Sequence, residues 1–226
     1  MILSVVIPCY NEARHISQVL AAVEAVDIEK EIIVVDDGST DGTPKVLEEY
    51  DKQKIITLHL SQKNFGKGAA IRTGLNYVTG DIVIIQDADL EYDPSQYPLL
   101  IEPILKGEAD VVYGSRFLGS IENMKIQNRI ANQLLKWLAN ILYGLRITDE
   151  ATCYKAFKTE VIKNLPLKST RFEFCPEVTA KLAKRKIKIV EVPIKYVART
   201  TDEGKKIRWT DFFTAVWTLI KYKFKD

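Results

Sequence analysis

Three carboxylates lie close together in the segment Asp87-Ala88-Asp89-Leu90-Glu91. Alternate residues of an extended chain point the same way, so Asp87, Asp89 and Glu91 can face one side. Like charges repel unless a cation neutralises them. Carboxylate oxygens suit Mg²⁺ or Mn²⁺, which such sites often hold jointly with substrate phosphates. Because the segment follows the apolar run 82–85, we predict a metal site at the end of a buried strand rather than a solvated acidic turn.

A second pair of carboxylates, Asp36 and Asp37, is followed by Gly38-Ser39. Carboxylates at a strand end can accept hydrogen bonds from ribose hydroxyls or from an N–H of a base. The same pattern is typical of an Asx turn beside a helix cap. The two uses are compatible, so both residues are candidates for nucleotide binding.

A glycine-rich segment, Asn64-Phe65-Gly66-Lys67-Gly68-Ala69-Ala70, precedes a predicted helix. Glycines at this position expose backbone N–H groups and Lys67 adds a positive charge, which together favour an anion. The segment is not a P-loop, because the spacing and the closing Lys-Ser/Thr are absent.

The first half of the chain alternates strand and helix patterns. Apolar runs predict strands at 2–7, 32–35, 55–60 and 82–85, and helical spacing predicts helices over 16–26, 46–50 and 66–78. This alternation indicates an α/β fold with a mainly parallel sheet and helices on both faces. Ligands of such sheets bind beyond the carboxyl ends of the strands, so the polar clusters that follow the strands should converge on one edge.

The second half is less regular. We predict a strand over 111–113 that ends before Arg116, a helix over 130–145, a strand over 187–192 that ends at Pro193, and an amphipathic helix over 212–224. No linker or internal repeat separates these elements. We therefore expect one domain over 1–226 with a C-terminal extension.

Bulk composition excludes several classes of protein. The 226 residues are 46% hydrophobic with a net charge of +2, which favours a packed domain and argues against a nucleic-acid binder, although the basic C-terminal third suggests an anionic partner. Three cysteines (Cys9, Cys153 and Cys175) give no disulfide framework or zinc spacing. Neither a signal peptide nor a transmembrane helix is expected.

Four ordered motifs carry a resemblance to a known family: Pro8-Cys9-Tyr10-Asn11-Glu12, Asp36-Asp37-Gly38-Ser39, Asn64-Phe65-Gly66-Lys67-Gly68 and Gln86-Asp87-Ala88-Asp89-Leu90-Glu91. Together they resemble family 2 glycosyltransferases, in particular the dolichol-phosphate mannosyltransferase and polyprenyl-phosphate glucosyltransferase branch. The resemblance implies a GT-A fold. Its Rossmann-like nucleotide-sugar half would cover about 1–115 and its acceptor half about 116–210, followed by a C-terminal helix over 211–226.

The resemblance also assigns residues. The nucleotide would be bound by Pro8, Tyr10, Glu12, Asp36, Asp37, Lys67, Asp87 and Lys205, the last from a loop over the donor diphosphate. The metal ligands would be Asp87, Asp89 and Glu91, where Glu91 departs from the Gln that the branch often has. The acceptor phosphate would be bound by Arg116, Arg129 and Arg199, and the catalytic set would be Asp89, Arg116 and Arg129.

The implied reaction is an inverting, metal-dependent transfer of mannose or glucose from a GDP-mannose or UDP-glucose class donor to a polyprenyl phosphate. A phosphate monoester is already an anion near neutral pH, its second pKa being about 6, so it needs cations rather than a base. Arginine suits this role because its planar fork binds phosphate bidentately.

Two other functions stay open. The first is a glycosyltransferase with a sugar or protein hydroxyl acceptor and with Asp149 or Glu150 as the base, although these acids could equally fix a loop or pair with Arg146 or Lys155. The second is a nucleotide-sugar-binding module without catalysis.

Two segments could touch a bilayer. The helix over 130–145 carries Trp137 and Tyr143, and the segment 211–225 combines aromatic residues with lysines. Both suit an interfacial helix, and both could instead pack on the core. We expect a peripheral protein on the cytoplasmic face of a membrane, attached directly or through a membrane-protein partner or homo-oligomer, and no nucleic-acid partner.

Overall fold

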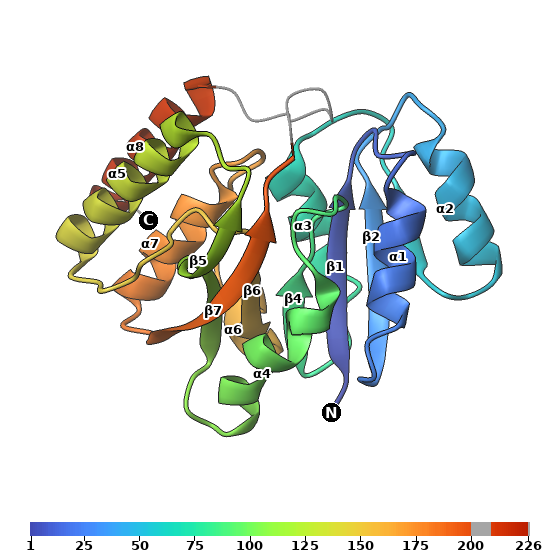
Figure 1. The fold of residues 1–226 in the computed structure, drawn as a ribbon, viewed down its shortest axis with the longest axis horizontal. Coiled ribbons are helices and arrows are strands. Elements are labelled where there is room, and N and C mark those ends of the chain that lie inside the picture. Colours follow the sequence, from blue (N-terminus) through green and yellow to red (C-terminus); the bar gives the residue numbers. More distant parts are fainter. Residues whose placement is uncertain (200–208, 226) are drawn as a thin grey trace.

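A sheet of seven strands in the order β3-β2-β1-β4-β6-β5-β7 forms the centre of the computed structural model, which describes residues 1–199 and 209–225 (Figure 1). All neighbouring strands pair in parallel except β6, which runs antiparallel to β4 and β5. The mainly parallel sheet is therefore confirmed. The strands are β1 (Leu3–Cys9), β2 (Lys30–Asp36), β3 (Thr57–Leu60), β4 (Ile82–Ile85), β5 (Val111–Glu122), β6 (Lys155–Lys158) and β7 (Ile189–Val197).

Helices cover both faces of the sheet, as predicted. Buried side chains of α1, α2 and α4 pack on one face, and those of α3, α6 and α7 pack on the other. The helices are α1 (Ile16–Glu24), α2 (Thr43–Lys52), α3 (Lys67–Leu75), α4 (Tyr97–Leu105), α5 (Ile126–Tyr143), α6 (Thr159–Lys163), α7 (Phe174–Lys184) and α8 (Trp209–Phe224), with a 3₁₀ turn η1 (Pro94–Gln96) before α4.

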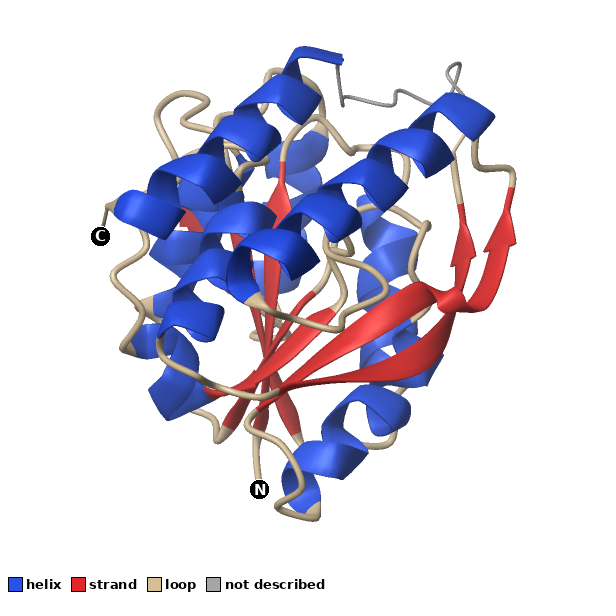
Figure 2. Ribbon diagram, turned by 90° about the vertical axis from the view of Figure 1, so that its left-hand side faces the viewer, coloured by secondary structure: helices blue, strands red, loops and turns tan. Residues whose placement is uncertain are grey.

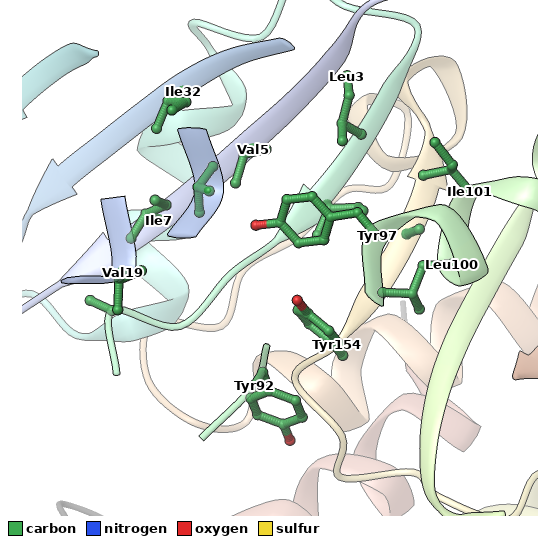
Figure 3. Close-up of a cluster of buried hydrophobic side chains, with 14 of the residues drawn as sticks. Leu3, Val5, Ile7, Val19, Ile32, Tyr92, Tyr97, Leu100, Ile101 and Tyr154 are labelled. Atoms are coloured by element: carbon green, nitrogen blue, oxygen red, sulfur yellow. The ribbon is translucent and has the colours of Figure 1, made fainter. Parts of the chain in front are cut away.

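Burial on both faces explains the continuous apolar runs of the inner strands. Every residue of β1 is buried. Leu3 and Val5 pack in the cluster that also contains α1 and α4 (Figure 3). Val6 packs with α3 on the opposite face. A strand covered on both sides has no solvent-facing positions, so its sequence does not alternate.

Buried tyrosines connect this core to the loop after β4. Tyr97 and Tyr154 both donate from their hydroxyls to Oε1 of Gln86, at 2.9 and 3.0 Å, and their rings lie in the core (Figure 3). The Gln86 amide in turn donates to the backbone oxygens of Asp87 and Tyr92. A buried phenol needs a hydrogen-bond partner, and here that partner fixes the backbone of the acidic segment.

The outer strands are longer than predicted. β5 continues to Glu122 with a register shift between Ser115 and Ser120, and β7 runs through Pro193. Proline lacks an N–H but is tolerated because β7 lies at the sheet edge. The expected strand ends at 113 and 193 were therefore wrong, and Arg116 lies within β5.

Helices α5 and α8 lie side by side next to α7 (Figure 2). The Tyr143 hydroxyl of α5 donates to the backbone oxygen of Leu219 in α8 at 2.6 Å, and Leu135 and Ala139 are buried between them. Across residues 1–199 and 209–225, the structure contains no helix whose length and apolar character would let it span a bilayer.

Candidate active site

A pocket of about 570 Å³ opens where β1, β2 and β4 end. The structure thus brings most of the predicted site residues together. The predicted residues that line the pocket are Pro8, Tyr10, Glu12, Asp37, Lys67, Asp87, Asp89, Glu91, Arg116 and Arg199. Asp36 and Arg129 do not line it, and Lys205 lies outside the described residues.

The two aspartates after β2 have different surroundings. Asp36 is 2% exposed, and its carboxylate accepts hydrogen bonds from the backbone N–H and the hydroxyl of Ser39, which is the turn-forming use of this motif. Asp37 accepts from the backbone N–H groups of Phe65 at 2.9 Å and Gly66 at 2.7 Å. Burial raises the pKa of Asp37, and these N–H groups oppose the rise. Only Asp37 faces the pocket.

Three N–H groups around the start of α3 are already engaged. Phe65 and Gly66 donate to Asp37, and the N–H of Ala69 donates to the backbone oxygen of Thr170 at 3.0 Å. The expected anion site therefore does not have these three N–H groups available, and Lys67 is the remaining cationic feature of this motif in the pocket.

Lys67 forms an ion pair with Asp87 and donates to the thiol sulfur of Cys153 at 3.0 Å. Burial works against its charged form, but Asp87 raises the pKa of Lys67 well above its ordinary value. The ammonium group is therefore held charged in the pocket, beside the first of the three clustered acids.

Arg199 bridges the loops after β1 and β4. Its guanidinium contacts Glu12 at 3.1 and 3.2 Å and Asp89 at 2.9 Å. Burial and the negative charges of Asp87 and Glu91 raise the pKa of Asp89 to about 7, and Arg199 opposes this rise. The crowding of acids is thus partly neutralised by a cation from the end of β7.

The third acid is held by residues of β7 and the segment after it. Glu91 accepts from the Tyr196 hydroxyl at 2.7 Å and from the Arg199 backbone N–H at 2.8 Å. Among the described residues, no three metal-binding side chains converge on one point. Asp87 and Asp89 nevertheless offer the hard oxygen ligands that suit a divalent cation shared with phosphates. The pKa of Asp89 is raised by burial first and then by repulsion from Asp87 and Glu91, and a cation would relieve that repulsion.

Arg116 is held rigidly on the other side of the pocket. Its Nε and Nη2 donate to the Asp149 carboxylate at 2.7 and 2.8 Å, and its backbone N–H donates to the same group at 3.0 Å. Its guanidinium also lies over the Tyr196 ring, 5.1 Å from the centroid. Burial opposes the charged form, but Tyr92 and Asp149 raise the pKa of Arg116, so the pocket keeps a fixed positive charge here.

The two acids weighed as a catalytic base lie outside the pocket lining. Asp149 is fully buried and engaged with Arg116. Glu150 is also fully buried, and neither of its carboxylate oxygens reaches a hydrogen-bond partner in the described part of the chain. Burial raises the pKa of Glu150 to about 7, and the charge of Lys155 opposes the rise. The geometry favours structural roles for both.

Arg129 lies apart from the other arginines. It is exposed on the first turns of α5, in a shallow groove with Ile126, Ile130 and Trp137. The structure therefore does not bring Arg129 together with Arg116 and Arg199.

Several lining residues carried no signal in the sequence. Tyr196 comes from β7, Arg171 and Phe172 from the loop before α7, and Thr210 and Asp211 from the start of α8. None belongs to a motif after a parallel strand. Their positions depend on how the second half of the chain returns to the sheet edge.

Comparison with known proteins identifies the family. Residues 4–165 match the model of glycosyl transferase family 2. The chain belongs to this family. The expected fold and family are therefore both confirmed.

The family 2 chain has several similar relatives. It is 32% identical to the undecaprenyl-phosphate 4-deoxy-4-formamido-L-arabinose transferase of Edwardsiella ictaluri, over 89% of this chain and 62% of that protein. It is 32% identical to the UDP-N-acetylglucosamine–dolichyl-phosphate N-acetylglucosaminyltransferase of Methanococcus voltae, over 85% and 84%. It is 28% identical to the dolichol-phosphate mannosyltransferase of Pyrococcus furiosus, over 99% and 65%. The chain thus spans less than two thirds of the length of the first and third relatives.

Solved structures share the fold. Glucosyl-3-phosphoglycerate synthase from Mycobacterium tuberculosis, solved with phosphoglyceric acid, superposes with a TM-score of 0.76 at 22% identity, over 99% of this chain and 80% of that one. S. aureus TarS superposes with a TM-score of 0.65 at 20% identity, over 99% and 72%.

Proposed function

We propose that this family 2 chain transfers a hexose, mannose or glucose, from a nucleotide-diphosphate sugar to a polyprenyl phosphate. The donor would be of the GDP-mannose or UDP-glucose class. Support comes from the relatives named as undecaprenyl-phosphate, dolichyl-phosphate and dolichol-phosphate transferases. About 1–115 would serve the donor, about 116–210 the acceptor, and 211–226 the C-terminal helix.

One observation carries the choice of a phosphate acceptor. Arg116 and Arg199 both line the pocket beside the acidic segment, while Asp149 and Glu150 do not. A hydroxyl acceptor needs a positioned base, whereas a phosphate needs positive charge. Asp149 is instead engaged in holding Arg116, which supports the phosphate over the hydroxyl acceptor.

The donor diphosphate would lie against Asp87 and Asp89 through Mg²⁺ or Mn²⁺, with Glu91 as the third predicted ligand. A bound divalent cation neutralises charge that builds on the leaving diphosphate. The mycobacterial synthase was solved with Mn²⁺ and UDP, which supports this expectation for the shared fold. Arg199 contacts Asp89 in the structure, so its guanidinium would have to move aside, toward the acceptor phosphate.

The reaction would be an in-line displacement. An acceptor phosphate oxygen attacks the anomeric carbon and forms the new bond as the bond to the donor diphosphate oxygen breaks, which inverts the configuration. The nucleoside diphosphate leaves with the electron pair, and no proton has to be removed from the acceptor. Arg116 would hold that phosphate. Lys67, together with Lys205 in its predicted role, would stabilise the leaving group.

Arg129 and the outer helices would meet the lipid. An apolar stripe on α5 is exposed to solvent and consists of Ile126, Ile130, Leu134, Trp137 and Ile141, at 50–73% exposure. Helix α5 contains no acidic residue, and Arg129 lies beside this stripe. Exposed aromatic and basic residues suit an anionic bilayer surface.

Neighbouring α8 extends this surface with Phe213, Trp217 and Phe224, at 60–80% exposure. We propose peripheral attachment at the cytoplasmic face through α5 and α8, with a membrane-protein partner or a homo-oligomer as further possible contacts.

The decisive test uses purified protein, labelled GDP-mannose and UDP-glucose, and vesicles containing a polyprenyl phosphate. We expect Mn²⁺- or Mg²⁺-dependent label in the lipid phase, which chelation abolishes and Asp89→Ala reduces at least about 100-fold. The matched control is Asp110→Asn, which changes an exposed acid far from the pocket.

Two other outcomes would reject the proposal. Label appearing only in water-soluble sugars or peptides would identify a hydroxyl acceptor. Donor binding without transfer or hydrolysis under any condition would identify a binding module.

A further inference from the structure

Among the described residues, four cations line the pocket: Lys67, Arg116, Arg171 and Arg199. Three of them are paired with carboxylates, namely Lys67 with Asp87, Arg116 with Asp149, and Arg199 with Glu12 and Asp89. The side chain of Arg171 is exposed and forms no hydrogen bond or ion pair within the described part of the chain. Of the pocket cations that the structure describes, it is therefore the one available to a ligand without first breaking an internal contact.

Several hydrogen bonds hold the loop that carries Arg171. Glu173 accepts from the backbone N–H groups of Thr170 at 3.0 Å and Arg171 at 3.2 Å. Glu177 accepts from those of Lys168 at 2.9 Å and Ser169 at 2.7 Å. Surface loops are usually mobile, and these bonds fix the backbone from which the Arg171 side chain extends.

The two glycines of the Gly66-Lys67-Gly68 motif let this loop approach α3. A Cβ on Gly66 would lie 2.4 Å from the Thr170 oxygen, and one on Gly68 would lie 2.8 Å from the Ser169 oxygen. Gly66 also has a φ of 103°, which other residues rarely adopt. The two glycines therefore serve close packing of the Arg171 loop against α3.

Arg171 stands on the Asp37 side of the pocket. Its Cγ lies close enough to Gly66 that a Cβ there would be 2.8 Å away, and the N–H of Gly66 is bound by Asp37. The positive charge of Arg171 also opposes the rise that burial causes in the pKa of Asp37. A guanidinium donor and a carboxylate acceptor are thus presented side by side.

We propose that Arg171 reads the base of the nucleotide donor, donating to a carbonyl oxygen of the base while Asp37 accepts the neighbouring ring N–H. This inference rests on the proposed function. Guanine and uracil both present a carbonyl oxygen beside a ring N–H, whereas adenine and cytosine present an amino donor at the corresponding place. The Arg171–Asp37 pair therefore selects oxo bases over amino bases.

The diphosphate is the other anionic part of the donor, and it has its own partners. Asp87 and Asp89, the predicted metal ligands, follow β4, and Lys67 and Arg199 contact them directly. Arg171 contacts neither acid. Its position beside Asp37 favours the base end of the donor.

The test compares nucleotide binding by isothermal titration calorimetry with Mn²⁺ present. UDP, GDP, CDP and ADP are titrated into the wild-type chain, Arg171→Ala, Arg171→Lys and the control Arg185→Ala, which removes an exposed arginine at the end of α7. We expect wild type to bind UDP or GDP at least about 10-fold more tightly than CDP and ADP. Arg171→Ala should weaken the preferred ligand about 10-fold or more and the amino-base nucleotides less than about 3-fold.

Arg171→Lys should not restore the preference, because an ammonium lacks the planar fork. Equal weakening of all four nucleotides would show a phosphate contact and overturn the inference, as would unchanged binding by Arg171→Ala or a wild type without base preference. If wild type binds no nucleotide, the proposed function itself fails. Unchanged melting temperatures of the variants separate these results from misfolding.

Discussion

Buried carboxylates keep Arg116 and Arg199 in place in the pocket. Asp149 is fully buried, and its two oxygens receive three hydrogen bonds from Arg116. Its backbone N–H is in turn bound by Glu191 at 2.9 Å. Arg116 is buried, so water cannot stabilise its charge before an anionic ligand binds. The carboxylate of Asp149 supplies a fixed counter-charge instead.

Asp149→Asn tests this role at the level of one residue. The amide leaves the guanidinium of Arg116 buried without a charged partner, so the free energy of unfolding should fall by about 3 kcal/mol. Urea unfolding measures the change. The control Asp110→Asn breaks an exposed pair with Lys158 and should cost less than about 1 kcal/mol. Equal losses in the two variants would contradict the prediction.

Glu150 predicts a pH dependence of stability. Burial raises its pKa from 4.5 to about 7, so between these values the folded protein binds more protons than the unfolded chain. The free energy of unfolding therefore falls as pH rises through this window. Glu150→Gln removes the titration and should be more stable than wild type at pH 8, by about 2 kcal/mol, with the difference shrinking toward pH 5. Denaturation at pH 5 and pH 8 measures this difference in the free energy of unfolding between the variant and wild type.

Neighbouring groups also act on the pKa of Glu150 and so on this pH dependence of stability. Lys155, Asp149 and Cys175 are the charged or titratable groups that act on it. The exposed Glu48→Gln serves as the control and should leave the pH dependence unchanged. A wild type and a Glu150→Gln variant with parallel pH profiles would refute the argument.

At the scale of elements, the start of α3 is a junction between the Asp37 turn and the loop before α7. Gly68→Ala tests whether close approach is what this junction requires. Alanine is the better helix former by about 1 kcal/mol. Its Cβ, however, would lie 2.8 Å from the Ser169 oxygen and 2.9 Å from the Arg171 oxygen.

We expect the clash to outweigh the gain in helix propensity. The free energy of unfolding, measured by thermal unfolding, should fall by about 1–2 kcal/mol, and nucleotide binding should weaken. Gly42→Ala is the matched control, since its Cβ would meet only the Ala13 side chain, at an ordinary 3.7 Å. A Gly68→Ala variant that is more stable than wild type would show that the loop moves freely.

Elements were predictable where one physical rule dominates. β4 was predicted at its observed bounds because four apolar residues end directly at Gln86-Asp87. Helix α7 was missed because its residues are buried on all sides, including Glu177 and Lys181, so no amphipathic stripe exists. Helix α4 was missed because two prolines interrupt its pattern.

The outer part of β5 was missed for another reason. It mixes glycine, serine and charged residues with Phe117, Leu118 and Ile121, and it forms a strand by pairing with β7. Pairing between distant segments leaves no local pattern in the sequence.

At the scale of the whole molecule, one part of the site was predictable from the sequence and another part was not. The clusters after β1, β2 and β4 were predicted to converge because the carboxyl ends of parallel strands meet at one edge. The pocket residues from the second half of the chain were not predictable, because Tyr196 reaches the pocket from β7 and Arg171 reaches it from a loop. Arg129 was expected beside Arg116, but α5 carries it onto an exposed face.

That exposed face gives a prediction for the molecule as a unit. Trp137→Glu adds a negative charge to the centre of the apolar stripe of α5, at a side chain that is 61% exposed. We expect binding to anionic vesicles to fall at least about 10-fold in co-sedimentation, with little change in melting temperature. The control Gln53→Glu adds the same charge at the end of α2, on the opposite side of the molecule (Figure 1). Equal vesicle binding by both variants would exclude α5 as the contact.

The pocket draws its lining from Pro8 near one end of the sequence to Asp211 near the other. During translation, the strands that present the acids emerge before Tyr196, Arg199 and the first turn of α8. A ribosome-bound intermediate that lacks them exposes Asp89 and Glu91 without their partners from β7. The nascent chain would therefore complete this pocket only once α8 has begun to form, so truncated chains that end before β7 would lack it even where their earlier strands had formed.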